Sequence, residues 1–301
     1  MPTPIPLIVI DGGGSGTRLR AIAADGTPLA EATAGPSNLT FGTDPAWRGI
    51  KTGINALERQ TGQRAIGTRL WCGLAGGRSP ERQAQFRADD PVGCAQIVIV
   101  TDGFASLIGA LGGQPGTVLA VGTGTAAFTL RADGHVVSAS AWGYKIGDEG
   151  SGGWIGRRAV SLLSRRLDGR HGRDSLLFDA LRSHVGADFD AIQSWLTDAD
   201  ATRFASLAPL VIDAAARGDA VATELLAQAA DELVIAIKAV DAGGPLALLG
   251  GLGPVMMPLL PADLQARVVA PKGNALDGLQ IMERFGWQDE RQVPLQVAAH
   301  G

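Results

Sequence analysis

Two short loops in this chain combine glycine with serine or threonine. The first is Asp11-Gly12-Gly13-Gly14-Ser15-Gly16-Thr17, and the second is Gly122-Thr123-Gly124-Thr125. Glycine lacks a Cβ, so backbone N–H groups in such loops can approach a phosphate closely, and the hydroxyl side chains add further donors. Neither loop is a P-loop, and the first does not open a helix as a dinucleotide fingerprint would. Either alone could be an ordinary hairpin, but together they predict a site that holds a polyphosphate from both sides.

Two aspartates follow apolar segments at positions where they could take part in phosphate chemistry. Asp11 heads the first loop, where a bare carboxylate would repel phosphate; a cation between them is therefore expected, and Mg²⁺ suits such ligands. Asp102 follows the run Ile97-Val98-Ile99-Val100-Thr101, at the carboxyl end of a predicted buried strand, where open α/β sheets bind ligands. It could accept the proton of a hydroxyl group that attacks a phosphate. Spacing alone favours the alternative that Asp102 caps the next helix.

Two further glycine-rich segments have both a structural and a functional interpretation. Asp148 and Glu149 lie in a loop with several glycines, where they could cap a helix or accept hydrogen bonds from vicinal sugar hydroxyls. The residue pattern alone does not choose between these roles. Gly250 and Gly251 follow a short apolar run and could admit a flat purine, but the residues alone favour a simple turn from strand to helix.

Composition narrows the classes of protein to consider. The chain has 301 residues, of which 46% are hydrophobic and 19% charged, and its net charge is −4. These values are typical of a globular protein large enough for two domains, and they do not favour nucleic acid or an anionic membrane as a partner. No apolar run is long enough to span a bilayer, and no signal peptide is recognisable. Cys72 and Cys94, the only cysteines, indicate reduced thiols in a cytoplasmic protein and form no zinc site.

The predicted elements form two similar series of strands. Three strands in antiparallel succession are expected first, then a helix, a strand, a helix, a strand and a short helix; from Thr117 the strand pattern starts again. The expected strands are 6–10, 17–23, 28–34, 68–74, 96–101, 117–121, 125–131, 135–140 and 246–249. The expected helices are 45–60, 79–88, 104–111, 154–167, 175–185, 189–196, 201–217, 220–240 and 275–285. The repeated pattern predicts a second α/β domain.

The motifs, taken in chain order, resemble the BadF/BadG/BcrA/BcrD ATPase family. They are Asp-Gly-Gly-Gly-Ser-Gly-Thr from Asp11, Ser-Asn at 37–38, Thr-Asp-Gly from Thr101, Gly-Thr-Gly-Thr from Gly122, Trp-Gly-x-x-x-Gly-Asp-Glu-Gly-Ser from Trp142, Gly-Gly at 250–251 and Gly-Asn-Ala-Leu-Asp-Gly from Gly273. Within this family the chain looks like the branch of N-acetylglucosamine kinases and bacterial glucosamine kinases. The resemblance covers nearly the whole chain, and the Gly-Asp-Glu-Gly-Ser block is its most specific part.

The resemblance implies an α/β fold of two ribonuclease-H-like domains, as in actin, Hsp70 and sugar kinases, flanking a cleft. The N-terminal domain would comprise residues 1–112, with the first phosphate loop and the catalytic aspartate. The C-terminal domain would comprise residues 113–301, with the second phosphate loop, the adenosine site and a helical insertion. The last helix is expected to pack back on the N-terminal domain. A homodimer through the helix-rich second domain is a further family-level expectation.

The resemblance also implies a role for each matching residue. Asp102 falls on the catalytic base, and Asp11 falls on the residue that acts through Mg²⁺. The ATP-binding positions are Gly13, Gly14, Ser15, Thr17, Gly122, Thr123 and Gly124 for the phosphates, and Gly250 and Gly251 for adenosine. The sugar-binding positions are Asn38, Asp102, Thr125, Trp142, Gly143 and Asp148. The cofactors implied are ATP and Mg²⁺, and the implied substrate is a small amino sugar.

The implied reaction is ATP-dependent phosphorylation of an amino sugar at its 6-hydroxyl. In mammalian N-acetylglucosamine kinases the Asn of the early loop is followed by His-Trp, whereas Asn38 is followed here by Leu39-Thr40. The choice between glucosamine and N-acetylglucosamine therefore stays open. Two alternatives remain beside the kinase: an ATPase that activates a radical dehydratase, for which Cys72 and Cys94 are poorly placed, and a catalytically silent sugar-binding regulator. The two-cysteine count excludes the related repressor kinases that have a cysteine-rich zinc site.

Overall fold

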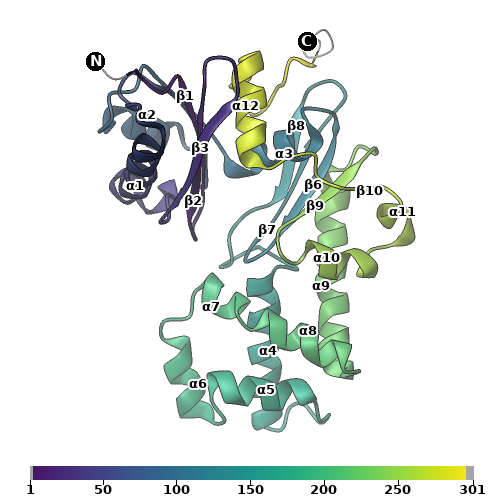
Figure 1. The fold of residues 1–301 in the computed structure, drawn as a ribbon. Coiled ribbons are helices and arrows are strands. Elements are labelled where there is room, and N and C mark those ends of the chain that lie inside the picture. The colour runs from purple at the N-terminus through teal and green to yellow at the C-terminus, as the bar shows by residue number, and fades with distance from the viewer. Residues whose placement is uncertain (1–2, 296–301) are drawn as a thin grey trace. The chain divides into compact units, whose positions relative to one another are not determined.

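The computed structural model describes residues 3–295 and contains two sheets of five strands each (Figure 1). The first sheet has the strand order β3-β2-β1-β4-β5. Strand β2 is antiparallel to β1 and β3, and β4 is parallel to β1 and β5. Its strands are β1 (Leu7–Gly12), β2 (Thr17–Ile22), β3 (Pro28–Ala34), β4 (Arg69–Leu74) and β5 (Gln96–Val100).

The second sheet repeats the order of the first, β10-β9-β6-β7-β8. Its strands are β6 (Gly116–Val121), β7 (Thr125–Leu130), β8 (Val136–Ser140), β9 (Leu246–Leu249) and β10 (Val268–Val269). In each sheet the strand that comes first in the chain lies in the centre, with the next two strands on one side and the last two on the other. This is the order of a ribonuclease-H-like domain. The predicted α/β fold with two such domains is confirmed.

The described residues form two compact units, and the first is built from three separate segments. It comprises the chain up to Gly116, residues 130–137, and the chain from Ala270 onward. The second unit comprises residues 117–129 and 138–269. Part of the β7–β8 hairpin and the C-terminal helix α12 (Ala275–Phe285) therefore belong to the unit that contains the first sheet.

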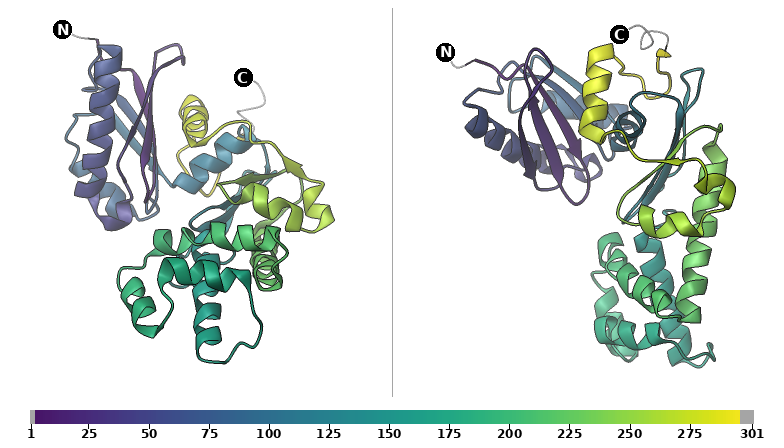
Figure 2. Two further views of the ribbon diagram at one scale, coloured as in Figure 1. Left: turned by 60° about the horizontal axis from the view of Figure 1, so that its bottom comes forward. Right: turned by 45° about the vertical axis from the view of Figure 1, so that its right-hand side comes forward.

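Helices cover both faces of the first sheet. Helices α1 (Thr43–Thr61) and α2 (Pro80–Ala88) lie on one face, and α3 (Asp102–Leu111) and α12 lie on the other (Figure 2). Because β1 is covered on both sides, its residues from Leu7 to Ile10 are all buried, as expected for a central strand. The core under α1 includes Trp47 stacked on Phe86, with ring centroids 4.1 Å apart.

Helices α3 and α12 approach each other unusually closely. A Cβ on Gly109 would lie 1.9 Å from the carbonyl oxygen of Asn274, and a Cβ on Gly278 would lie 2.0 Å from the carbonyl oxygen of Ala105. Glycine at these two positions therefore lets the backbones come into direct contact. This crossing holds α3, the helix that begins at Asp102, against the last helix of the chain.

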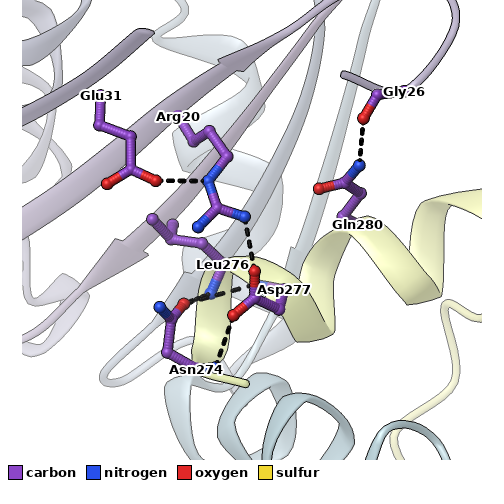
Figure 3. Close-up of polar contacts among 7 residues, drawn as sticks. All are labelled: Arg20, Gly26, Glu31, Asn274, Leu276, Asp277 and Gln280. Atoms are coloured by element: carbon purple, nitrogen blue, oxygen red, sulfur yellow. Dashed lines mark hydrogen bonds and ion pairs between the residues drawn. The ribbon is translucent and has the colours of Figure 1, made fainter. Parts of the chain in front are cut away.

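A polar network attaches α12 to the sheet (Figure 3). Arg20 of β2 donates from Nε to Glu31 and from Nη1 to Asp277, each at 2.6 Å. Asp277 is also the third residue of α12 and completes the capping box that starts this helix, where its carboxylate accepts the N–H of Asn274 at 2.7 Å. Gln280 donates to the carbonyl of Gly26 in the turn between β2 and β3. These contacts fix the start of α12 against β2.

The second unit has a large helical segment between β8 and β9. Its members are α4 (Gly152–Leu167), α5 (Leu176–Val185), α6 (Phe189–Leu196), α7 (Ala201–Ala205), α8 (Ala208–Ala216) and α9 (Ala220–Val240). Helices α4 to α8 gather beyond one end of the strands, and α9 runs from this group back along the sheet (Figure 1). Short elements follow β9: α10 (Gly253–Met256), a 3₁₀ turn (Met257–Leu259) and α11 (Ala262–Gln265).

One predicted helix in this segment is wrong. The range 201–217 is expected to form a single helix, but it is divided into α7 and α8. Pro209 lies in the first turn of α8, where its missing N–H costs no intrahelical hydrogen bond. Within a continuous helix the same proline would remove a bond and clash with the preceding turn, so the chain begins a new helix there.

Candidate active site

The first glycine loop joins β1 to β2 and is closed by its own backbone. The N–H of Gly13 donates to the carbonyl of Gly16 at 3.0 Å, and the N–H of Ser37 donates to the carbonyl of Gly13 at 3.2 Å. A Cβ on Gly12 would overlap the Ser37 hydroxyl, which explains the glycine there. Gly14 and Ser15 are exposed at the tip of this loop, where they are accessible to a phosphate.

The Thr17 side chain stabilises this loop through hydrogen bonds. The side chain is buried, and its hydroxyl donates to the carbonyl of Gly35 at 2.6 Å. The same oxygen lies 2.7 Å from the Ser37 hydroxyl oxygen. A hydroxyl has one proton, so the Ser37 hydroxyl is the donor in this second contact if both bonds form together. In the structure Thr17 therefore connects the phosphate loop to the segment 35–37.

Asp11 faces Arg18 across the hairpin. The two residues are paired in the β1–β2 register, and Arg18 donates to Asp11 Oδ2 from Nε at 3.0 Å and from Nη2 at 2.5 Å. Both bonds go to Oδ2, which leaves Oδ1 for another ligand. The Arg18 side chain is 53% exposed beside the phosphate loop. Sequence reasoning missed Arg18, although its place opposite Asp11 in a predicted hairpin would have indicated it.

Asp102 is the first residue of α3, but it does not cap that helix. The cap is Thr101, whose hydroxyl accepts the N–H of Phe104 at 3.3 Å. The expectation that Asp102 is the cap is wrong, because Thr101 occupies the extended position just outside the helix. The Asp102 carboxylate accepts only the adjacent Gly103 N–H, at 2.9 Å, among the hydrogen bonds of the described residues. Burial raises its pKa, and the nearby Asp11 carboxylate raises it further.

Asn38 caps the 3₁₀ turn Leu39–Phe41. Its Oδ1 accepts the N–H of Thr40 at 2.8 Å, so its amide NH₂ remains as a donor for a ligand. A Cβ on Gly14 would lie 4.0 Å from this NH₂ group, which therefore points toward the phosphate loop. Of the two residues that replace His-Trp, Leu39 is buried in the core and Thr40 is exposed.

In the second unit, the loop Gly122–Thr125 rests on the start of α4. The N–H groups of Gly152 and Gly153 donate to the carbonyls of Gly122 and Thr123, at 2.8 and 3.1 Å. The loop itself is closed by the bond from the Gly122 N–H to the Gly124 carbonyl at 3.0 Å. These bonds use helix N–H groups that would otherwise lack partners, and they fix the loop rigidly on the helix.

Gly250 brings the turn after β9 against the same loop. Its φ is +84°, and a Cβ would lie 2.3 Å from the carbonyl oxygen of Val121. Only glycine satisfies both conditions. Gly251 is exposed, and a Cβ there would meet nothing within 4 Å. The turn therefore has one glycine that is packed and one that is open to a ligand.

Asp148 contacts the other side of the Gly122–Thr125 loop. Its Oδ1 accepts the N–H of Thr125 at 3.3 Å, and a Cβ on Gly124 would lie 2.8 Å from Oδ2. Burial raises the pKa of Asp148, partly offset by the N–H groups of Thr125 and Gly143. The Thr125 hydroxyl is buried without a hydrogen-bond partner among the described residues. A buried polar atom of this kind is expected to have a ligand or a water as its partner.

Backbone strain in the second unit is concentrated around Asp148. Among the described residues, the non-glycine residues with positive φ are Ser140, Ala141 and Asp148. Each such conformation costs on the order of 1 kcal/mol, and strain of this kind gathers at ligand sites. Trp142, in the same loop, is 76% exposed, and Gly143 is beside it with a φ of +80°. The loop therefore presents an aromatic ring and strained backbone next to a buried carboxylate.

No group of three or more metal-ligating side chains occurs among residues 3–295. The donor set at Asp11 nevertheless suits Mg²⁺ in a nucleotide complex, because this ion takes one or two carboxylates together with waters and phosphate oxygens. In the described part of the chain, no helix is long and apolar enough to cross a membrane.

Comparison with known proteins identifies the family. The model of the BadF/BadG/BcrA/BcrD ATPase family matches residues 9–244, and the chain belongs to this family. The glucosamine kinase of Vibrio cholerae is 27% identical over 275 residues, which cover 89% of this chain and 92% of that protein. The N-acetylmuramic acid/N-acetylglucosamine kinase of Clostridium acetobutylicum is 31% identical over 245 residues, 78% of each chain. A crystal structure from Chromobacterium violaceum, provisionally assigned as an N-acetylglucosamine kinase, is 39% identical, with a TM-score of 0.85 over 93% of this chain and 99% of that one.

Proposed function

We propose that this protein is an ATP-dependent kinase that phosphorylates glucosamine or N-acetylglucosamine at the 6-hydroxyl. The observation that carries this proposal is the position and the hydrogen bonding of the Asp102 carboxylate. Its carboxylate lies at the start of α3, is not used as a cap, and has a raised affinity for protons. Such a group suits the task of taking a proton from a sugar hydroxyl. The relatives named as amino-sugar kinases support the same function.

We assign the phosphates of ATP to the two glycine loops. The exposed tip residues Gly14 and Ser15 would offer N–H groups in the first unit, and Thr123 and Gly124 would do so in the second, where the Gly122 N–H closes the loop. The open glycine Gly251 leaves space for the adenosine. Arg18 would supply a positive charge to the phosphates, because its guanidinium is exposed beside the first loop.

Asp11 would hold Mg²⁺ through its free Oδ1, directly or through a water. Bound there, Mg²⁺ would neutralise charge on the phosphates. The chain's own contribution is mainly positioning and electrostatics, since phosphoryl transfer needs little covalent chemistry from the protein. A general base such as Asp102 typically contributes about 10²–10⁴-fold to the rate.

We assign sugar binding to side chains that have a polar group or an exposed ring available for a ligand. Asp148 offers carboxylate oxygens for vicinal hydroxyls, and Thr125 offers a buried hydroxyl that has no partner in the described chain. Asn38 offers its amide NH₂ group as a donor, and Trp142 offers an exposed ring beside Gly143. The chemistry of these groups suits a polyhydroxylated ring, while the 2-substituent is left to be determined.

The test is ADP release measured with Mg-ATP and a panel of glucosamine, N-acetylglucosamine, N-acetylmuramic acid, glucose and no sugar. Strong release with one amino sugar, and a product phosphorylated at the 6-hydroxyl by NMR, would support the proposal and settle the substrate. Release that does not depend on sugar would instead favour an activator-type ATPase. Sugar binding in calorimetry without any ADP release would favour a silent regulator.

A further inference from the structure

The segment that follows α12 is held firmly in the first unit. Trp287 is 1% exposed, stacks on Phe285 with ring centroids 5.1 Å apart, and contacts the turn at Gly113. Further along, the N–H of Val293 donates to the carbonyl of Gly134 at 2.8 Å. The segment Trp287–Val293 is therefore anchored at both ends, and Glu290 lies between the anchors.

Glu290 binds both polar groups of Thr101, the cap of the helix that starts at Asp102. One carboxylate oxygen accepts the Thr101 N–H, and the other accepts the Thr101 hydroxyl at 3.1 Å. The hydroxyl oxygen in turn accepts the N–H of Phe104. Because a hydroxyl can donate and accept at once, these bonds form a chain from Glu290 through Thr101 into the first turn of α3.

The charges around Glu290 differ from those of an ordinary surface glutamate. Burial raises its pKa, with the N–H and hydroxyl of Thr101 and the positive charge of Arg78 acting in the opposite direction. The Asp102 carboxylate adds to the increase as a like charge. A second carboxylate is therefore held near the proposed base, at a cost that its contacts with Thr101 offset only in part.

We propose that Glu290 is a positioning residue for phosphoryl transfer, which fixes Thr101 and through it the direction of the Asp102 carboxylate. The inference rests on the proposed role of Asp102 as the base. Without Glu290, two donors on Thr101 lose their acceptor and the first turn of α3 becomes free to shift. A displacement of about 1 Å at a reacting group can reduce the rate by about 10²-fold. Substrate binding, which we assign to other residues, would change little.

The test compares Glu290→Gln with the wild type in ADP release with the preferred amino sugar. Gln keeps the size of the side chain and one acceptor oxygen but loses the second acceptor and the charge. We expect kcat to fall by about 10–100-fold, while KM for ATP and for the sugar changes by no more than about twofold. The matched control is Asp289→Asn, which removes an exposed acid on the same segment that pairs with Arg291. This control should keep the wild-type kcat.

A second variant separates positioning from general loss of stability. Thr101→Val removes one of the two groups through which Glu290 would act but keeps the backbone N–H, so Glu290→Gln should slow the Thr101→Val variant by less than it slows the wild type. Thermal unfolding is measured for each variant, and rates are taken well below the lowest melting temperature. A wild-type kcat in Glu290→Gln, or effects that multiply fully in the double variant, would overturn the inference. A wild type that shows no sugar-dependent ADP release would instead overturn the proposed function.

Discussion

Replacement of Arg20 by methionine should destabilise the first unit measurably. Arg20→Met keeps the apolar stem but removes the guanidinium that joins β2 to Glu31 and Asp277. The Arg20 side chain is only 10% exposed, so water cannot readily replace these bonds. Both carboxylates would lose a charged donor, although Asp277 would keep the N–H of Asn274.

The expected magnitude follows from the exposure of the two partners. Glu31 is 59% exposed, so its ion pair contributes about 0–1 kcal/mol. Asp277 is 39% exposed, and loss of a hydrogen bond between charged groups costs about 1.5–3 kcal/mol, with the lower end appropriate at this exposure. We therefore expect the free energy of unfolding to fall by about 2 kcal/mol. For a unit of this size the melting temperature should drop by about 4–8 °C.

The assay is urea unfolding followed by tryptophan fluorescence and circular dichroism, with Asp277→Asn and the double variant completing a mutant cycle. Arg291→Met is the control, because that side chain is 89% exposed and its ion pair should contribute less than about 0.5 kcal/mol. A free energy of unfolding for Arg20→Met within about 0.5 kcal/mol of the wild type would refute the reasoning. So would additive effects of Arg20→Met and Asp277→Asn.

The same pair makes a prediction about pH. Burial works to raise the pKa of Asp277, but the hydrogen bonds from Arg20 and from the Asn274 N–H outweigh it and leave the pKa below its ordinary value. A lowered pKa means that the ionised carboxylate stabilises the folded state above the unfolded pKa, about 3.9. That stability is lost as the pH falls through the folded value. The difference between wild type and Arg20→Met should therefore shrink as the pH is lowered below about 4.

Three further predictions concern the proposed site and the helix crossing. Asp102→Asn should fold normally but lose at least about 10²-fold in kcat, and near-wild-type turnover would exclude Asp102 as the base. Because burial and the Asp11 carboxylate raise the pKa of Asp102, the acid limb of the pH profile of kcat/KM in the wild type should lie above the ordinary range for an aspartate. Thr125→Val should raise KM for the sugar more than KM for ATP in initial-rate assays, and equal changes in both would contradict a sugar contact. Gly109→Ala should destabilise by about 1–3 kcal/mol in urea unfolding despite the better helix propensity of alanine, since its Cβ would overlap a carbonyl oxygen; an unchanged midpoint would refute this crossing.

The sequence predicts well what is determined locally. The two glycine loops and the meander of strands around each one depend on residues within a few positions of each other, so the positions of these strands and loops along the chain can be predicted from the sequence. The loop that contains Asp148 can be located in the same way, because a block of glycines marks it in the sequence. The break between α7 and α8 depends on Pro209, a local signal that the predicted single helix ignores.

Residues that depend on distant partners could not be predicted in this way. Glu290 lies 189 positions after Thr101 and has no motif around it, so only the folded chain brings the two together. The pairing of Arg20 with Asp277 is of the same kind, across 257 positions. The cap of α3 is Thr101, which has an extended backbone, and residue types alone do not determine whether Thr101 or Asp102 takes this position.

The segmented first unit has a consequence for how the protein is made. Helix α12 contributes Leu276, Leu279 and Met282 to the buried interior, and it contacts α3 and the first sheet. When the ribosome has synthesised residues up to Gly116, every strand of that sheet has been made, but α12, one of the two helices on one face, has not. Part of this face therefore stays uncovered in the nascent chain until α12 emerges. A premature stop before residue 275 would leave the proposed base on a helix without its packing partner, so the shortest fragment expected to have activity is close to the entire chain.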